Sequence, residues 1–130
     1  MVCSLLAVGH TTHLLIFDSP TFRRNDINRT AEFSAPSPGG VTRLCADDND
    51  KKVRDWLRDQ VLALGASKYT VNATGSQFAT FPGEDESLPP IAMGSHLDTV
   101  ATGGRFDGPL GVWLSCPFAD NAASMARLTP

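Results

Sequence analysis

MGSHLDTVATGGRFDG, residues 93–108, carries one histidine and two aspartates, with a glycine pair between the aspartates. The residues that lead into it are apolar and predict a short, buried β-strand from Ile91 to Ser95. Open α/β sheets form their sites beyond the carboxyl ends of such strands, and the glycine pair lets the following loop fold back tightly. We therefore expect His96, Asp98 and Asp107 to converge beyond the end of this strand.

These three side chains have the chemistry of a metal site. His96 and Asp98 are two residues apart, so on an extended chain they point to the same side. A histidine that binds a metal usually donates its other ring N–H to a carboxylate, which Asp98 can supply. Asp107 can bridge two cations through its two oxygens, and two metal ions roughly 3.5–4 Å apart activate water and polarise a carbonyl.

Structural roles explain the same residues without a metal. His96 can be a hydrogen-bonded histidine at the end of a strand, Asp98 can cap a turn, and Asp107–Gly108 can form a β-turn. A second pair, His10 and His13, has the spacing of two ligands on one helix face, but it lies in a segment that we leave outside the fold. Spacing alone leaves these interpretations open.

The preceding residues predict the other elements of an α/β domain. Apolar residues recur at helical spacing over Asp48–Leu64, aspartates crowd the start of that segment and Gly65 follows it, which predicts a helix buried on one side. Tyr69–Asn72 and Gln77–Phe81, with a turn at Thr74–Gly75, predict a β-hairpin. Helix, hairpin and a third strand, which we expect to be central, give an α/β fold.

Composition excludes several classes of protein. The 130 residues are 42% hydrophobic and carry a net charge of −3 without a basic patch, so nucleic acid is not an expected partner. No stretch approaches the roughly 18 apolar residues of a membrane span. The three cysteines are odd in number and form no Cys-x-x-Cys, which argues against a disulfide framework and favours a cytoplasmic setting.

The chain divides into three parts by its pattern. Residues 1–25 have neither the basic start of a signal peptide nor an Arg-rich amphipathic presequence, and we treat them as a leader or an incorrect start. Residues 26–112 carry the predicted elements, beginning with a short helix over Asp26–Phe33. Residues 113–130 show no sustained periodicity and are taken as a divergent tail.

Four blocks resemble the amidohydrolase family that includes N-carbamoyl-L-amino acid hydrolases, β-ureidopropionases and allantoate amidohydrolases, within the larger aminoacylase and zinc-carboxypeptidase-like group. GGVTRL (39–44) and DKKVRDWL (50–57) resemble the family's amino-terminal helices, and ATGSQFA (73–79) resembles its hairpin. GSHLDTV, GGRFDG and the GV that follows (94–112) resemble its metal loop. The resemblance implies the amino-terminal part of a zinc-peptidase-like α/β catalytic domain, consisting of helix, β-hairpin, central strand and metal loop.

The resemblance also implies roles for individual residues. His96 matches a metal ligand, Asp107 the metal-bridging aspartate, and Asp98 the catalytic-site carboxylate that orients the histidine. The peptide bond Asp107–Gly108 matches one that is often cis in the wider group. The implied cofactor is a pair of zinc or manganese ions. The implied activity is hydrolysis of a linear amide or ureido C–N bond in a small molecule such as an N-carbamoyl amino acid.

The chain also departs from the family. Pro109 stands where an aliphatic residue is usual, and the resemblance ends after Val112. The family's paired glutamates, which include the general base, its later histidine and the lid domain that supports its homodimer have no match. We therefore expect a truncated chain that is inactive alone. The alternatives are a non-catalytic product and part of an aminoacylase- or dipeptidase-type zinc hydrolase.

Overall fold

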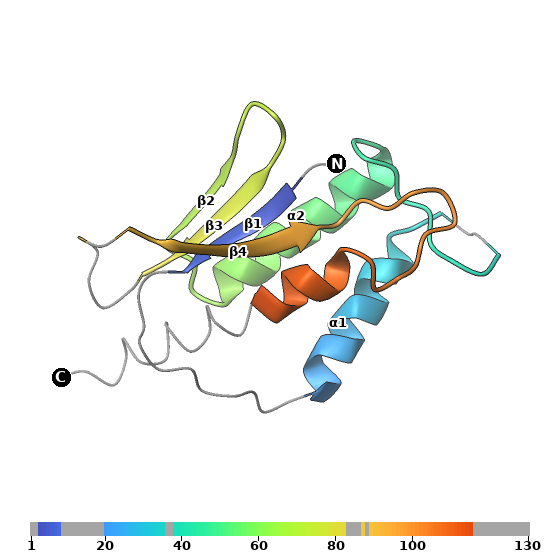
Figure 1. Cartoon of the computed structure of the whole chain (residues 1–130), viewed down its shortest axis with the longest axis horizontal. Coiled ribbons are helices and arrows are strands. Elements are labelled where there is room, and N and C mark those ends of the chain that lie inside the picture. The colour runs from blue at the N-terminus through green and yellow to red at the C-terminus, as the bar shows by residue number, and fades with distance from the viewer. Residues whose placement is uncertain (1–2, 9–19, 36–37, 83–86, 88, 116–130) are drawn as a thin grey trace.

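A four-stranded mixed sheet forms the framework of the computed structural model, which describes residues 3–8, 20–35, 38–82, 87 and 89–115 (Figure 1). The sheet order is β2-β3-β1-β4. The strands are β1 (Cys3–Val8), β2 (Lys68–Val71), β3 (Gln77–Phe81) and β4 (Ile91–His96). Strand β1 is parallel to β3 and antiparallel to β4, and β2 and β3 form an antiparallel hairpin.

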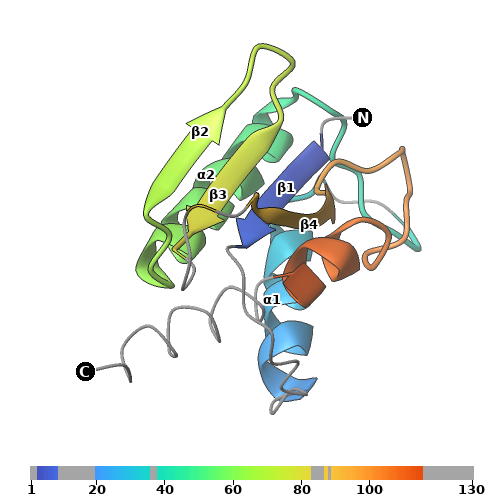
Figure 2. The same ribbon diagram turned by 60° about the vertical axis from the view of Figure 1, so that its left-hand side comes forward.

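Helices cover the sheet. The two long ones are α1 (Pro20–Glu32) and α2 (Asp48–Ala63). A third helix begins at Pro109 and runs through Ser115, the last described residue. Figure 2 shows α2 behind β2 and β3, with this third helix, in orange, beside α1. Proline suits the first position of a helix because its missing N–H has no partner there in any case.

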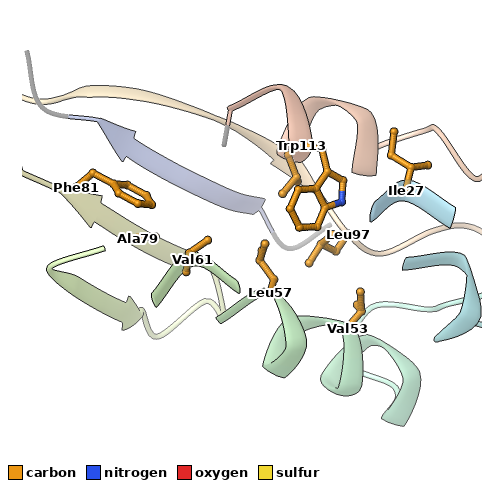
Figure 3. Close-up of a cluster of buried hydrophobic side chains, with 9 residues drawn as sticks. Ile27, Val53, Leu57, Val61, Ala79, Phe81, Leu97 and Trp113 are labelled. Atoms are coloured by element: carbon orange, nitrogen blue, oxygen red, sulfur yellow. The ribbon is translucent and has the colours of Figure 1, made fainter. Parts of the chain in front are cut away.

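The hydrophobic core lies between α2, β3 and the third helix (Figure 3). One face of α2 supplies apolar side chains at helical spacing, and the inward side chains of β3 pack against them. Leu97, which follows β4, closes the core from the side of the predicted metal loop. The buried apolar residues of the core are Ile27, Val53, Leu57, Val61, Ala79, Phe81, Leu97, Val112 and Trp113.

Helix α2 has defined ends. Asp47 is its N-cap, and its carboxylate accepts hydrogen bonds from the backbone N–H groups of Asp50 (2.7 Å) and Leu44 (3.0 Å). At the other end Gly65 has a φ of 98°, and its N–H donates to Leu62 O at 3.1 Å. These contacts satisfy backbone groups that every helix end otherwise leaves unpaired.

Most of the predicted elements are confirmed. The helix predicted over Asp48–Leu64 is α2, and the hairpin predicted over 69–72 and 77–81 is formed by β2 and β3. The strand predicted over 91–95 is β4, one residue longer. The short helix expected over 26–33 is the second half of α1.

Four expectations differ from the structure. Strand β4 is an edge strand in the described sheet and not a central one. The prediction was wrong because a short apolar run does not reveal which strands will lie beside it. Its neighbour β1 comes from residues 1–25, which we had left outside the fold. The GGVTRL block is extended and not helical, with isolated β-bridges at Val41 and Thr42. The third helix crosses the expected boundary after residue 112, because Trp113 packs in the core.

No helix in the described part of the chain is long and apolar enough to cross a membrane.

The cap of α2 gives a stability prediction. Replacing Asp47 with alanine removes the acceptor for two backbone N–H groups and should lower the free energy of unfolding by about 0.5–2 kcal/mol in urea denaturation. The exposed Lys52 on the same helix is the control, and Lys52→Ala should stay within about 0.5 kcal/mol of the original chain. Equal stabilities of the two variants would contradict the cap.

Candidate active site

His96, at the end of β4, lies between the two aspartates of the predicted site. Its Nε2 is 3.9 Å from Oδ1 of Asp107, and its Nδ1 is 3.5 Å from Oδ1 of Asp98. The side chains of His96 and Asp98 are 15% and 13% exposed, whereas that of Asp107 is 73% exposed. The structure therefore brings the three side chains together, with the two carboxylates at opposite nitrogens of one ring.

A hydrogen bond orients the imidazole. His96 Nδ1 lies 2.8 Å from the main-chain carbonyl oxygen of Asp98. A carbonyl oxygen can only accept, so Nδ1 carries a hydrogen, and in the neutral ring this leaves the Nε2 lone pair on the side of Asp107. We expected the carboxylate of Asp98 to take this role. The main-chain carbonyl takes it instead because the strand ends at His96 and the next two residues bring that carbonyl closer to the ring than the carboxylate.

The backbone of Gly108 lies close to the ring near Nδ1 and Cε1. A Cβ at this position would lie 2.5 Å from His96 Nδ1 and 2.6 Å from Cε1, and it would also collide with the His96 carbonyl oxygen. Gly108 has a φ of +88°, in the region that favours glycine. The histidine therefore occupies space that any side chain at 108 would fill.

The peptide bond Asp107–Gly108 is trans, contrary to the expectation from the resemblance, since the described residues contain no cis peptide bond. The positive φ of Gly108 makes the turn instead, and the third helix starts at the next residue, Pro109. The expected β-turn at 107–108 is close to the observed structure, which has a turn over 105–108.

The loop between β4 and the third helix is held by the extended segment Val41–Arg43. Val41 and Gly103 exchange two backbone hydrogen bonds of 2.9 and 2.8 Å. Thr99 N donates to Arg43 O at 2.7 Å, and Thr102 N donates to the hydroxyl of Thr42 at 2.9 Å. The anchoring role of the GGVTRL block could not be predicted, because the hydrogen-bond partners of these residues lie far downstream. The glycine-rich loop is thus anchored along its length.

The two donor atoms are compatible with a cation. Zinc–nitrogen and zinc–oxygen bonds are each about 2 Å long, so two ligands of one ion lie at most about 4 Å apart. The separation of 3.9 Å between His96 Nε2 and Asp107 Oδ1 is within this limit but longer than the roughly 3.3 Å between two ligand atoms of a tetrahedral zinc ion, so the exposed Asp107 carboxylate would have to move closer to share one. Asp98 faces the other ring nitrogen and is not a third ligand. Among the described residues no group of three or more His, Cys, Asp or Glu is arranged to hold a metal ion.

The second histidine pair, His10 and His13, lies outside the described residues, as does the tail from residue 116 onward.

The contact between Gly108 and His96 can be tested with a matched pair of glycines. Gly39 has a φ of +78° and no atom within 4 Å of an added Cβ, so Gly39→Ala carries only the backbone cost of about 1–2 kcal/mol. Gly108→Ala should lower the free energy of unfolding, measured in urea, by more than Gly39→Ala does, because its Cβ also collides with the His96 ring. It should also shift the His96 ring signals in NMR, which Gly39→Ala leaves in place. Equal losses with unmoved ring signals would refute the contact.

Comparisons with known proteins identify relatives of this segment. No protein-family model matches the chain. A ureidoglycolate hydrolase from Arabidopsis thaliana is 35% identical over 99 residues, which are 75% of this chain and 20% of the relative. An N-carbamoyl-L-amino-acid amidohydrolase from Rhizobium meliloti is 41% identical over 78 residues, which are 57% of this chain and 18% of the relative. The chain therefore spans about a fifth of the length of these curated relatives.

The fold agrees with that relationship. A crystal structure of a hydantoinase/carbamoylase family amidase from Burkholderia ambifaria aligns with a TM-score of 0.73 and 32% sequence identity, over 84% of this chain and 26% of that protein. Over the segment that they share, this chain belongs to the amidohydrolase family of the N-carbamoyl-L-amino-acid amidohydrolases and ureidoglycolate hydrolases.

Proposed function

We propose that this chain supplies the histidine–aspartate half of a two-metal site in an amidohydrolase that cleaves linear amide or ureido C–N bonds. The observation that carries the proposal is the orientation of His96, whose Nδ1 is hydrogen-bonded to Asp98 O while its Nε2 lies 3.9 Å from Asp107 Oδ1. A histidine that served only to complete hydrogen bonds would not need a carboxylate beside its free lone pair.

The names of the relatives support the substrate class. N-carbamoyl-L-amino acids and ureidoglycolate are both small molecules with a ureido group and a carboxylate. We infer a substrate of this chemistry for the complete site to which this chain contributes.

Each residue has a distinct role in this proposal. His96, through Nε2, and the exposed carboxylate of Asp107 are the residues that would hold the metal ions. Asp98 holds the ring through its main-chain carbonyl, and its carboxylate lies behind the ring. A pair of zinc or manganese ions held there would supply Lewis acidity toward a carbonyl oxygen and would lower the pKa of water.

Zinc binding tests the ligand assignment. The chain should bind Zn²⁺ with a Kd weaker than about 1 μM, or about 8 kcal/mol, because it offers two ligands where complete structural sites reach about 10–16 kcal/mol. In calorimetry, His96→Gln and Asp107→Asn should each weaken binding by at least about tenfold, since even partners outside the coordination shell contribute about 10–100-fold.

The control is Asp59→Asn, which removes an aspartate that is 62% exposed on α2 and distant in sequence from the site. This variant should bind zinc like the original chain. Zinc binding that survives both His96→Gln and Asp107→Asn would refute the ligand assignment.

Activity tests the proposed reaction. The 130 residues alone should not detectably hydrolyse N-carbamoyl-L-amino acids or ureidoglycolate, because a catalytic zinc needs about three protein ligands and we assign two in this chain. A missing general base costs a further 10²–10⁴-fold or so. Turnover by the short chain with added zinc or manganese would contradict this account.

A chimera tests the positive claim. Residues 3–115 should replace the matching segment of the Rhizobium meliloti amidohydrolase with metal-dependent hydrolysis of N-carbamoyl-L-amino acids retained, and Asp107→Ala should abolish it. A folded, metal-loaded chimera that cleaves N-acyl amino acids or dipeptides instead would favour an aminoacylase- or dipeptidase-type site. A folded, metal-loaded chimera without any of these activities would favour a non-catalytic chain.

A further inference from the structure

Arg43 has a side chain buried to an extent that arginine seldom reaches, with 1% of the residue exposed. Its sequence context, the GGVTRL block, does not reveal this burial. Burial lowers the pKa of its guanidinium, and the negative charges of Asp50, Asp47 and Asp98 oppose that shift. Arginine stays protonated under such conditions, so the fold keeps a full positive charge beside the predicted site.

Within the described part of the chain the guanidinium makes four hydrogen bonds, all to oxygen atoms without a formal charge. Nε and Nη2 both donate to the carbonyl oxygen of Leu97, at 2.8 and 2.5 Å. Nη1 donates to Thr30 O in α1 at 2.7 Å and to the hydroxyl of Ser34 at 2.8 Å. Arg43 thus ties the residue between His96 and Asp98 to the end of α1.

The main chain of Arg43 holds the other side of Asp98. Arg43 N donates to the hydroxyl of Thr99 at 2.9 Å, and Arg43 O accepts from Thr99 N at 2.7 Å. Leu97 and Thr99 are both buried, at 1% and 7% exposure. Asp98 therefore lies between two residues whose positions Arg43 fixes, and it is the carbonyl of Asp98 that accepts from the imidazole.

We propose that Arg43 is a positioning residue of the site, which holds Leu97–Thr99 at both ends so that Asp98 O keeps the His96 ring in its Nδ1–H form with Nε2 free for a cation. The part that concerns the cation rests on the proposed function, whereas the part that concerns the ring does not. Arg43 acts through the loop and does not itself touch the metal or the substrate.

The hydrogen bonds from Arg43 to Leu97, Thr99 and α1 are called the Arg43 clamp below, and those made by its side chain require an arginine. Two donors of one planar group converge on Leu97 O while a third nitrogen reaches α1. Lysine has a similar stem and the same charge, but its ammonium is a compact group that cannot span these acceptors together. Arg43→Lys therefore keeps a buried positive charge and removes the planar group whose donors reach these acceptors together.

Arg54 offers a matched control. It is a half-buried arginine whose Nη2 donates to the carbonyl oxygen of Gly75, in the turn of the β2–β3 hairpin. Arg54→Lys also breaks an arginine–carbonyl bond between a helix and a loop, but it does so away from His96. Any effect common to both variants reflects stability and not positioning.

The experiment measures the tautomer of His96 by ¹H–¹⁵N NMR of the imidazole nitrogens in the metal-free 130-residue chain, and zinc affinity by calorimetry. We expect a dominant Nδ1–H form in the original chain and in Arg54→Lys. In Arg43→Lys we expect a mixture of the two tautomers and a loss of zinc affinity of about 10–100-fold, the usual cost of a lost supporting partner.

Each outcome bears on the inference. A folded Arg43→Lys chain with the tautomer of the original chain overturns it, whatever its zinc affinity. If Arg43→Lys does not fold, Thr99→Val decides, because it removes the acceptor of Arg43 N and leaves the guanidinium in place. An unchanged tautomer in Thr99→Val then overturns the clamp, and a mixed one supports it. If the original chain binds no zinc, the metal assignment fails, and the tautomer alone still decides the role of Arg43.

Discussion

The hydrogen bond between His96 Nδ1 and Asp98 O, 2.8 Å long, is the constraint on which the candidate site depends. It decides which nitrogen carries the proton, and hence which nitrogen can meet a cation. A flexible loop could not keep this bond, because a carbonyl that moved by an ångström would release the ring to the other tautomer. The surrounding structure is best understood as the set of contacts that keep that one carbonyl still.

Those contacts come from three directions. Gly108, in the turn before the third helix, brings its bare backbone close to the ring. The extended segment at Val41–Arg43 pairs with the loop at Thr99 and Gly103. Leu97 packs into the core between α2 and the third helix, so the main chain beside Asp98 is held by hydrophobic burial as well as by hydrogen bonds. The core and the site are therefore one unit of structure.

The fold was predictable where local signals agree with the final packing. Helix α2 has an apolar stripe, an aspartate cap and a terminal glycine within one stretch of chain, and the hairpin has its turn residues between two short strands. Strand β1 could not be recognised, because a short apolar run near the amino terminus looks the same in a leader and in a sheet. The edge position of β4 could not be predicted either, because it depends on β1 lying between β3 and β4.

The residues of the site could be predicted from the sequence, but the hydrogen bonds that position them could not. His96, Asp98 and Asp107 follow from a spacing that implies chemistry, and the structure brings them together. The roles of Arg43 and of the Asp98 carbonyl did not follow, since main-chain acceptors leave no trace in sequence and a buried arginine looks like any surface arginine.

The long reach of the Arg43 clamp has a consequence for how the chain folds. Its bonds to Leu97 join residues 54 positions apart, and closing a loop of that size costs entropy before any contact compensates. Helix α2 and the hairpin can form from neighbouring residues, whereas the histidine acquires its final orientation only after α1, the core and the last loop have docked. From this sequence separation we expect the geometry for a cation to be assembled after the local elements have formed.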